Sequence, residues 1–260
     1  MLKFKIPDFS IEQIANSGQC FRINKTENAW QVIALGKVLE IQQVDKNSCA
    51  FNCSKEEYEN IWTNYFDLNR NYNEIKKAIL ETKDAYLIKA VEYGYGLRIL
   101  KQDAWEIIVS FIISQRNNIP RIKNTIKKLC VPYGAFFPWA SDLAKHTEKD
   151  FKSMGLGYRA KYLVDIVKAV NSGDFDIEYL KKLSYQDAIK YMKQFNGIGD
   201  KVANCIALFG LHKIEAFPRD VWINRIIENQ YNGKFNIKRF AGYAGIVQQY
   251  MFFYQRSLGR

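Results

Sequence analysis

Residues 191–220, YMKQFNGIGDKVANCIALFGLHKIEAFPRD, combine a helix-turn-helix pattern with two chemically reactive side chains. A helix-periodic stretch runs to Phe195, the turn Gly197-Ile198-Gly199 follows, and a second helix is predicted from Asp200-Lys201-Val202 to Gly210. Glycines let the backbone turn sharply and approach a ligand closely. The free N–H groups at the start of a helix suit a phosphate. The stretch therefore predicts an anion-binding hairpin.

Lys201 and Asp220 flank this hairpin, nineteen residues apart. The positive end of the helix dipole disfavours an ammonium at Lys201, and a neutral amine is a nucleophile that forms a Schiff base with a sugar carbon. Asp220 precedes a helical pattern and is a predicted N-cap, so helix N–H groups are expected to keep its carboxylate ionised. Each residue alone is compatible with a structural role; together at this spacing they predict catalysis.

The positive charge of the chain is unevenly distributed. Residues 1–90 carry 12 basic and 12 acidic side chains, whereas residues 91–260 carry 26 basic and 15 acidic ones. The whole net charge of +11 therefore lies in the later part, which predicts a polyanionic partner, with nucleic acid favoured over a membrane. Charge alone leaves open a basic protein without such a partner.

The cysteines and the chain start indicate the cellular environment. Neither the five cysteines nor the two histidines have the spacing of a metal site, so no metal is expected, and the thiols are expected to be reduced. The start MLKFKIPDFS lacks the apolar core of a signal peptide, and the apolar residues 105–113 are too few to span a bilayer. We expect a soluble, monomeric, cytoplasmic protein, associated with the nucleoid if prokaryotic.

The periodicity predicts an α+β fold, with a small antiparallel β-sheet domain over residues 1–83 and a larger all-helical domain over 84–260 that contains the helix-hairpin-helix motif. Strands are expected at 30–35, 38–41 and 50–53, the first two joined by a turn at Gly36-Lys37. Helices are expected over 104–114 with Asp103 as cap and Trp105, Ile108, Phe111 and Ile112 on one face, from Pro120 to Cys130, from the Ser184 cap to Phe195, and from 239 to 255.

Five segments together resemble the helix-hairpin-helix DNA glycosylases that carry a Gly/Pro-rich loop and an aspartate, and within that superfamily the 8-oxoguanine DNA glycosylases. The hairpin alone indicates the superfamily, whereas the segments in family order indicate the branch. They are residues 17–22, 117–122, 155–162, 197–205 with 217–221, and 243–245 with Gln248 and Phe252. The related iron–sulfur branch ends in a four-cysteine cluster that this chain lacks.

The resemblance implies a DNA repair enzyme that flips and excises 8-oxoguanine from duplex DNA, with an accompanying β-elimination (AP lyase) step. Lys201 matches the nucleophile that attacks C1′, and Asp220 matches the carboxylate that supports departure of the base. The chemistry implied by this resemblance needs no cofactor. The implied base pocket comprises a backbone carbonyl that accepts N7–H of the lesion, two residues on the faces of the base and one at its Watson–Crick edge: Gly18, Cys205 with Phe252, and Gln248.

The resemblance also implies the contacts with DNA. Tyr158 matches a wedge in the base stack, and Arg121 and Arg159 match readers of the cytosine opposite the lesion. The other implied DNA contacts are the clamp on a phosphate, Gly197, Gly199 and Val202; the gap-filling loop, Arg116, Asn117 and Asn118; and Trp222 near a phosphate.

Three residues depart from the family pattern. Arg116 stands where better-known relatives have a third asparagine, and Trp222 where they have a histidine. Asp200 places a negative charge beside the phosphate site. The first departure bears on opposite-base preference and the other two on affinity.

Two alternatives stay open. A helix-hairpin-helix glycosylase for another damaged base, such as an alkylated purine, that uses only activated water needs no lysine at position 201. A non-catalytic helix-hairpin-helix DNA-binding protein needs neither Lys201 nor Asp220.

Overall fold

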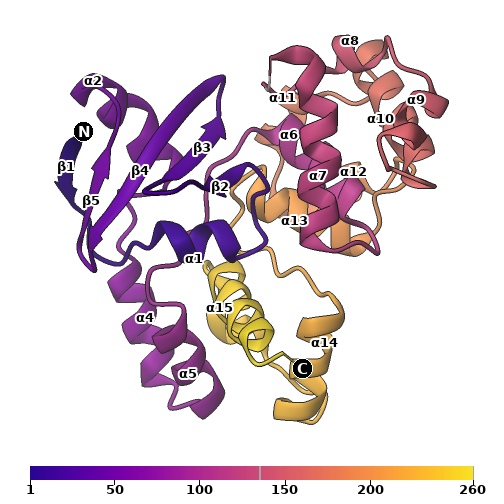
Figure 1. Ribbon diagram of the computed structural model, residues 1–260. Helices are drawn as coiled ribbons and strands as arrows, with labels where there is room; N and C mark the ends of the chain where they lie inside the picture. The colour runs from indigo at the N-terminus through magenta and orange to yellow at the C-terminus, as the bar shows by residue number, and fades with distance from the viewer. Residues whose placement is uncertain (135, 260) are drawn as a thin grey trace.

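A five-stranded antiparallel sheet and a larger group of helices make up the computed structural model, which describes residues 1–134 and 136–259 (Figure 1). The elements in chain order are β1 (Leu2–Lys5), α1 (Ile11–Asn16), β2 (Ile23–Lys25), β3 (Trp30–Ala34), β4 (Lys37–Asp45), β5 (Ser48–Phe51), α2 (Lys55–Glu57), η1 (Tyr58–Trp62), α3 (Thr63–Tyr65), α4 (Tyr72–Glu81), α5 (Ala85–Tyr93), α6 (Ala104–Ser114), α7 (Ile119–Cys130), η2 (Val131–Tyr133), α8 (Ala140–Leu143), α9 (Glu148–Ser153), α10 (Arg159–Ser172), α11 (Ile177–Lys182), α12 (Tyr185–Met192), α13 (Asp200–Phe209), α14 (Val221–Tyr231), η3 (Ile237–Phe240) and α15 (Ala244–Ser257). The predicted α+β fold is confirmed.

The sheet has the strand order β1-β5-β4-β3-β2. The predicted hairpin is present, but its turn was predicted one residue too late. Ala34 pairs with Lys37, which belongs to β4, so the two turn residues are Leu35 and Gly36, with φ angles of 53° and 69°. A two-residue turn with both φ values positive matches the twist of the flanking strands. The third predicted strand, 50–53, is present as β5 but lies two residues earlier, at Ser48–Phe51. Strands β1 and β2 were not predicted, because edge strands of three or four residues show little alternation.

The core has two parts. Under the sheet, Val32, Leu39 and Phe51 are buried together with Ile11 and Ile14 of α1. The second, larger cluster fills the helical part. The expectation that the helical pattern begins near residue 84 was wrong, because α1 and α4 precede that point.

The placement of α4 bears on the domain boundary. Tyr72 and Ile79 of α4 are buried in the helical cluster, not under the sheet. The division between residues 83 and 84 itself stays a prediction.

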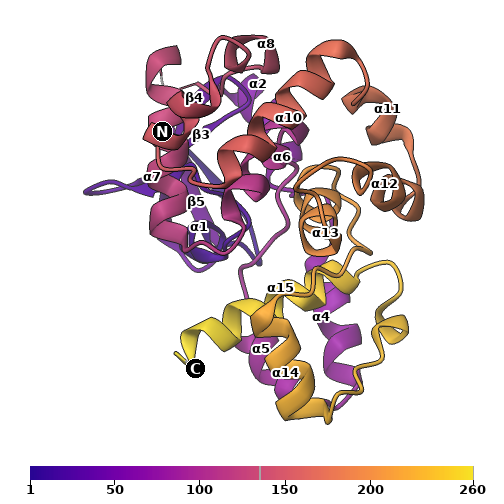
Figure 2. The ribbon, with the colours of Figure 1, turned by 90° about the vertical axis from the view of Figure 1, so that its right-hand side faces the viewer.

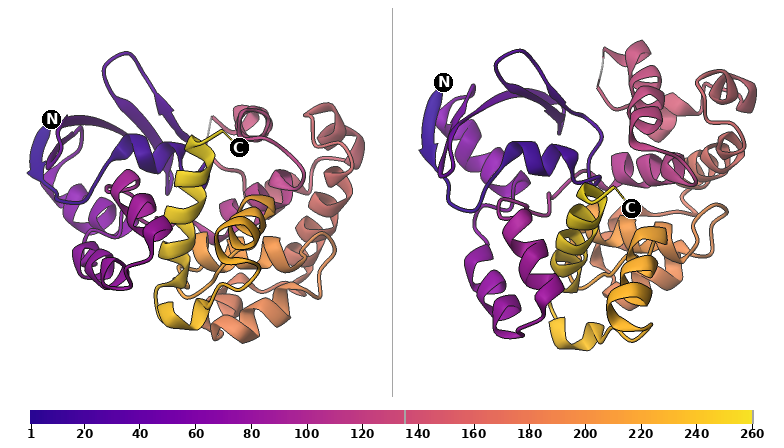
Figure 3. Two further views of the ribbon diagram at one scale, coloured as in Figure 1. Left: turned by 90° about the horizontal axis from the view of Figure 1, so that it is seen from below. Right: turned by 60° about the horizontal axis from the view of Figure 1, so that its bottom comes forward.

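Helix α15 brings the end of the chain back to its first half. It packs against α5, and it lies between the α4–α5 pair and the later helices (Figure 3). In Figure 2 it runs across the molecule below α13 and above α14. The C-terminal helix therefore closes the helical part and carries residues 244–257 to the place where α1, α6 and α13 meet.

Helix α6 is the centre of the helical core. Asp103 caps it as predicted, because its Oδ1 accepts a hydrogen bond from the Glu106 N–H at 2.8 Å. The four residues predicted to share a face are all buried, and Ile107, Val109 and Ile113 on the other sides of the helix are buried as well. A helix surrounded by others buries every side, and a periodic pattern cannot reveal this. The predicted helix from Pro120 to Cys130 is confirmed as α7.

Two predicted helix ends were wrong. Helix α12 begins after its Ser184 cap but ends at Met192, because the chain must leave it to form the hairpin before Gly197. The last helix begins at Ala244, not near 239, because the extended Ala241 and the positive φ of Gly242 separate it from a short 3-10 turn. In the described residues, no helix is both long and apolar enough to cross a membrane.

Candidate active site

The predicted hairpin joins α12 to α13. Gly197 has a φ of 82°, and a side chain there would overlap the ring of Tyr162, so this position requires glycine. The backbone at Gly199, the N-cap of α13, does not need glycine in order to turn, because its φ of −85° is open to any residue. The expectation that both glycines allow the sharp turn therefore holds only for Gly197. The contribution of Gly199 is open space, since nothing lies within 4 Å of where a Cβ would be.

The first turn of α13 faces a groove. Gly199, Asp200, Lys201 and Val202 all line it, and the N–H groups of a helix start have no acceptor within the helix. Asp200 is paired with Lys193, whose Nζ lies 2.6 Å from its Oδ1. This ion pair offsets the negative charge that the sequence places beside the predicted phosphate clamp.

Lys201 is half-buried, one helical turn before Cys205. Its Nζ lies 5.3 Å from the centre of the Phe111 ring. Burial raises the pKa of the Cys205 thiol to about 11, although the nearby Lys201, which hydrogen-bonds to it, opposes the shift. The thiol is therefore protonated at neutral pH and lies against the amine as a small, uncharged group.

Asp220 caps α14 as predicted, with its Oδ1 accepting a hydrogen bond from the Ile223 N–H at 2.9 Å. Burial nevertheless raises the pKa of this carboxyl above its usual value, and this effect outweighs both the helix N–H groups and the nearby Lys201. The expectation that the helix N–H groups keep the Asp220 carboxylate ionised was therefore wrong in direction, because desolvation has a larger effect on its pKa than these hydrogen bonds.

The six predicted catalytic and base-pocket residues come together around one small chamber of about 60 Å³. They are Gly18, Lys201, Cys205, Asp220, Gln248 and Phe252. Gly18 follows α1 with a φ of 78°, and an added Cβ would lie 3.2 Å from the Phe252 ring. Four of the six also line the groove, which has a volume of about 790 Å³, so the chamber opens into it.

The loop between α6 and α7 forms another wall of the groove. Arg116, Asn117 and Asn118 line it, as does Trp222 from α14. Asn118 caps α7 by accepting the Arg121 N–H at 3.0 Å, and Arg116 is exposed with a φ of 45°. The loop therefore presents a cation and two amides to whatever occupies the groove.

Tyr158, Arg159 and Arg121 lie outside the lining of the groove as the described residues define it. Arg159 is 6% exposed, and its guanidinium donates to the carbonyls of Gln115, Leu156 and Arg116 at 2.6, 3.3 and 2.9 Å. Tyr158 is 50% exposed, with its ring 4.6 Å from that guanidinium. Their roles as wedge and cytosine readers stay predictions.

Sequence reasoning missed three residues at this site. Gln115 donates to the Gly197 carbonyl at 3.0 Å. Arg256 lines the groove with its guanidinium 5.5 Å from the Phe252 ring, and Gln249 lines the chamber. Helical spacing signals Arg256, four residues after Phe252, and Gln249 is signalled as the second glutamine in an otherwise apolar stretch.

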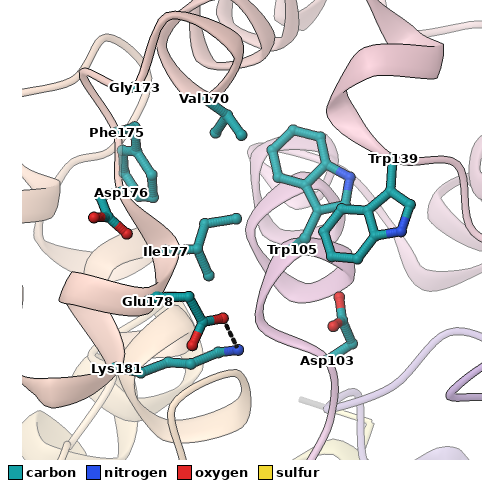
Figure 4. Close-up of a pocket in the computed structure, with 10 residues that line it drawn as sticks. All are labelled: Asp103, Trp105, Trp139, Val170, Gly173, Phe175, Asp176, Ile177, Glu178 and Lys181. Carbon is teal, nitrogen blue, oxygen red and sulfur yellow. Dashed lines mark hydrogen bonds and ion pairs between the residues drawn. The ribbon is translucent and has the colours of Figure 1, made fainter.

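A second cavity, of about 410 Å³, lies near the start of α6 and contains none of the predicted site residues. The indoles of Trp105 and Trp139 form one side of it, with Phe175 and Ile177 across from them (Figure 4). Its charged groups are already engaged: Asp103 and Asp176 cap helices, and Glu178 pairs with Lys181 at 2.7 Å. This cavity therefore lies apart from the catalytic and base-pocket residues that the sequence predicts.

Residues 109–238 match the family model described as HhH-GPD superfamily base excision DNA repair protein, and residues 1–108 match that of the 8-oxoguanine DNA glycosylase N-terminal domain. The fold and the hairpin site thus define a base excision DNA repair protein of the helix-hairpin-helix class.

Similar solved structures indicate which family within this class the chain belongs to. The MBOgg1 structure in complex with a low-affinity DNA ligand superposes with a TM-score of 0.92 at 33% identity, covering 99% of this chain and 96% of that one. The Clostridium acetobutylicum 8-oxoguanine glycosylase/lyase, in complex with dsDNA containing cytosine opposite 8-oxoG, gives 0.90 at 36% identity, covering 98% and 94%. The chain belongs to the 8-oxoguanine DNA glycosylase family, as the five segments predicted.

The sequence similarity to a curated relative extends over only part of either chain. The N-glycosylase/DNA lyase of Saccharomyces cerevisiae is 35% identical over 158 residues, which make up 52% of this chain and 42% of that protein. The chain therefore matches less than half the length of this relative.

Proposed function

We propose that this chain is a DNA glycosylase and AP lyase that removes 8-oxoguanine from duplex DNA. One observation supports the proposal most strongly: the Lys201 amine, the Asp220 carboxylate and the four predicted base-pocket residues all line the same chamber. They come from the segment after α1, from α13, from the N-cap of α14 and from α15. Packing of apolar side chains does not explain why these polar groups from separate elements meet in one place.

The groove receives the damaged strand. The N–H groups at the start of α13 bind a phosphate, and Arg116, Arg219 and Arg256 along the groove neutralise others. Such contacts position the duplex without reading its sequence. The DNA substrate places the protein with the genome, at the nucleoid in a prokaryotic cell.

The extruded base enters the chamber edge first. The Gly18 carbonyl accepts N7–H, which 8-oxoguanine carries and guanine lacks, while Cys205 and Phe252 cover its two faces. Gln248 meets the Watson–Crick edge. One hydrogen bond contributes about 1 kcal/mol and an unpaired group costs about 1–3 kcal/mol, so extrusion itself must supply part of the selectivity.

Lys201 and Asp220 perform the chemistry. The Nζ lone pair attacks C1′, the C1′–N9 bond breaks, and its electron pair leaves with the base, which takes up a proton. Asp220 as carboxylate stabilises the positive charge that develops on the sugar. The sugar ring then opens to a Schiff base on Lys201, and loss of a C2′ proton expels the 3′ phosphate.

The opposite strand is read by arginines. Arg121 and Arg159 donate to the O2 and N3 acceptors of cytosine, and Tyr158 fills the space beside the extruded base. Arg159 uses three N–H groups on backbone carbonyls, and a guanidinium has five. Two donors thus serve the base.

Borohydride trapping tests the proposal against both alternatives. The protein is incubated with borohydride and one of three duplexes: one containing 8-oxoguanine, one containing an alkylated purine, and one undamaged. A covalent complex with the first alone is expected. Trapping or base release on the alkylated duplex alone would indicate the other glycosylase, and DNA binding without trapping or base release on any duplex would indicate a non-catalytic module.

A further inference from the structure

Two adjacent glutamines lie in the most buried part of α15. Gln248 and Gln249 are each 3% exposed, and both line the small chamber. Burying an amide costs free energy unless its donors and acceptors are paired, so a second glutamine here requires a physical reason.

The Gln249 amide is only half satisfied. Its Nε2 donates to Oε1 of Gln248 at 3.3 Å. Its own Oε1 is buried and has no hydrogen-bond partner among the residues that the structure describes. With the Gln248 amide held in place, turning the Gln249 amide over would bring the two side-chain oxygens together, which is repulsive. Because the Gln249 side chain lines the chamber, a group that enters the chamber can supply the missing partner.

The position of the chamber indicates the source of that partner. Lys201 and Asp220 line the chamber and the groove alike, so a base extruded beside the amine has its leading edge among these glutamines. A space of about 60 Å³ holds a few water molecules or one edge of a base.

The chemistry of 8-oxoguanine supplies two donors at that edge, N1–H and the 2-amino group. Oε1 of Gln248 already accepts one hydrogen bond from Gln249, which leaves it one further lone pair. Two donors on the base therefore need a second acceptor. Resting on the proposed function, we propose that Gln249 is a second base-recognition residue, whose Oε1 accepts a hydrogen bond from the 2-amino group.

A pair of substrates isolates this contact. 8-Oxohypoxanthine differs from 8-oxoguanine by lacking the 2-amino group, so single-turnover excision of the two bases from otherwise identical duplexes measures its contribution. We expect the wild-type protein to excise 8-oxoguanine about 10-fold faster, as one hydrogen bond to a buried acceptor implies. Gln249→Leu, similar in size but without an acceptor, should lower excision of 8-oxoguanine by that factor and leave 8-oxohypoxanthine unchanged.

Two further variants control for misfolding and for the general effect of changing a buried polar group. Gln249→Asn keeps the amide but shortens it by one methylene, so it should give an intermediate ratio even if leucine impairs folding. Tyr250→Phe is the matched control, because the Tyr250 hydroxyl is also buried without a partner among the described residues but lies outside the chamber lining. It should leave the substrate ratio at the wild-type value.

The results distinguish the possible failures. An equal loss on both substrates in Gln249→Leu would mean that Gln249 acts through packing. An unchanged ratio would mean that water satisfies its Oε1. If Gln249→Leu has no effect in a Gln248→Ala background, it acts only by orienting Gln248. Each of these overturns the proposal, whereas absence of any 8-oxoguanine excision by the wild type would overturn the proposed function instead.

Discussion

The side-chain amide of Gln115 donates a hydrogen bond to the main-chain carbonyl oxygen of Gly197 at 3.0 Å. The main-chain carbonyl oxygen of Gln115 also accepts hydrogen bonds from Nε of Arg159 at 2.6 Å and from the Tyr158 hydroxyl at 3.3 Å. One residue thus connects the hairpin turn, the loop at 116–118 and the start of α10. The predicted phosphate clamp and the predicted opposite-strand contacts are therefore mechanically coupled.

Gln115→Ala should weaken binding to lesion duplex. The change removes the bond to Gly197 and lets the hairpin and the loop move independently, which should cost about 1 kcal/mol, or about a 5-fold rise in Kd. Fluorescence anisotropy measures it. Asn171→Ala is the control, since the Asn171 side-chain amide makes a similar bond, of 2.9 Å, to the main-chain carbonyl of Ala140, and neither residue lines the groove. Equal Kd values for the two variants would contradict the coupling.

Lys201→Gln should abolish borohydride trapping while largely preserving affinity for lesion DNA. The change removes the amine and leaves a polar side chain of similar length in the groove. Lys193→Gln is the matched control, because Lys193 lies beside the same turn but pairs with Asp200. Trapping is measured by gel electrophoresis, and normal trapping by Lys201→Gln would show that another amine is the nucleophile.

Excision should fall as pH is lowered, with the loss assigned to Asp220. Burial raises the pKa of this carboxyl above its ordinary value of 3.8, so protonation begins at a higher pH than for an exposed aspartate. Because the proposed role needs the carboxylate, single-turnover rates should show an acid limb with a midpoint above 3.8. A midpoint at or below that value would contradict the assignment.

Asp220→Asn should lose excision and keep or gain stability at pH 7. A raised pKa means that folding favours the protonated carboxyl, so this group's contribution to stability is lost as pH rises through the folded pKa. Asparagine caps helices as well as aspartate does and carries no charge. Thermal denaturation of both proteins at pH 7 measures this, and a clear loss of stability in the variant would show that the ionised cap stabilises the fold.

Cytosine opposite the lesion should be preferred, but less strictly than in relatives with asparagine at position 116. A mismatched arginine contact costs about 1–3 kcal/mol, or about 5- to 150-fold in rate. Arg116 is expected to pair with phosphate whatever the opposite base, so Arg116→Asn should sharpen the preference, whereas Arg159→Ala should flatten it. Single-turnover excision from four duplexes, one for each opposite base, is the measurement. Faster excision opposite adenine would contradict these roles.

Affinity for duplex DNA should fall steeply with salt. Each phosphate contact contributes about −0.9 to the slope of log K against log salt. Arg256→Ala should make the slope shallower by about that amount, whereas Lys3→Ala, in the electrically neutral first 90 residues, should not change it. A slope near zero for the wild-type protein would exclude duplex DNA as its partner.

Local interactions account for what the sequence by itself determined. The caps at Asp103 and Asp220 and the end of α13 before Gly210 each depend on neighbours a few residues away. The hairpin between β3 and β4 is also local, but its turn was predicted one residue too late. The hairpin with a lysine and an aspartate at fixed spacing indicated the superfamily because it is a local pattern, and the order of the five segments along the chain indicated the branch.

Tertiary packing decided what depends on distant neighbours. The burial of α6 on every side, the raised pKa of Asp220 and the engagement of the Arg159 guanidinium with the 115–116 loop arise from residues far away in the chain. Gln249 lines the chamber because α15 returns to α5 and places residue 249 beside Lys201. Desolvation and hydrogen-bond satisfaction are set by the whole surroundings of a group, and only the folded chain defines those surroundings.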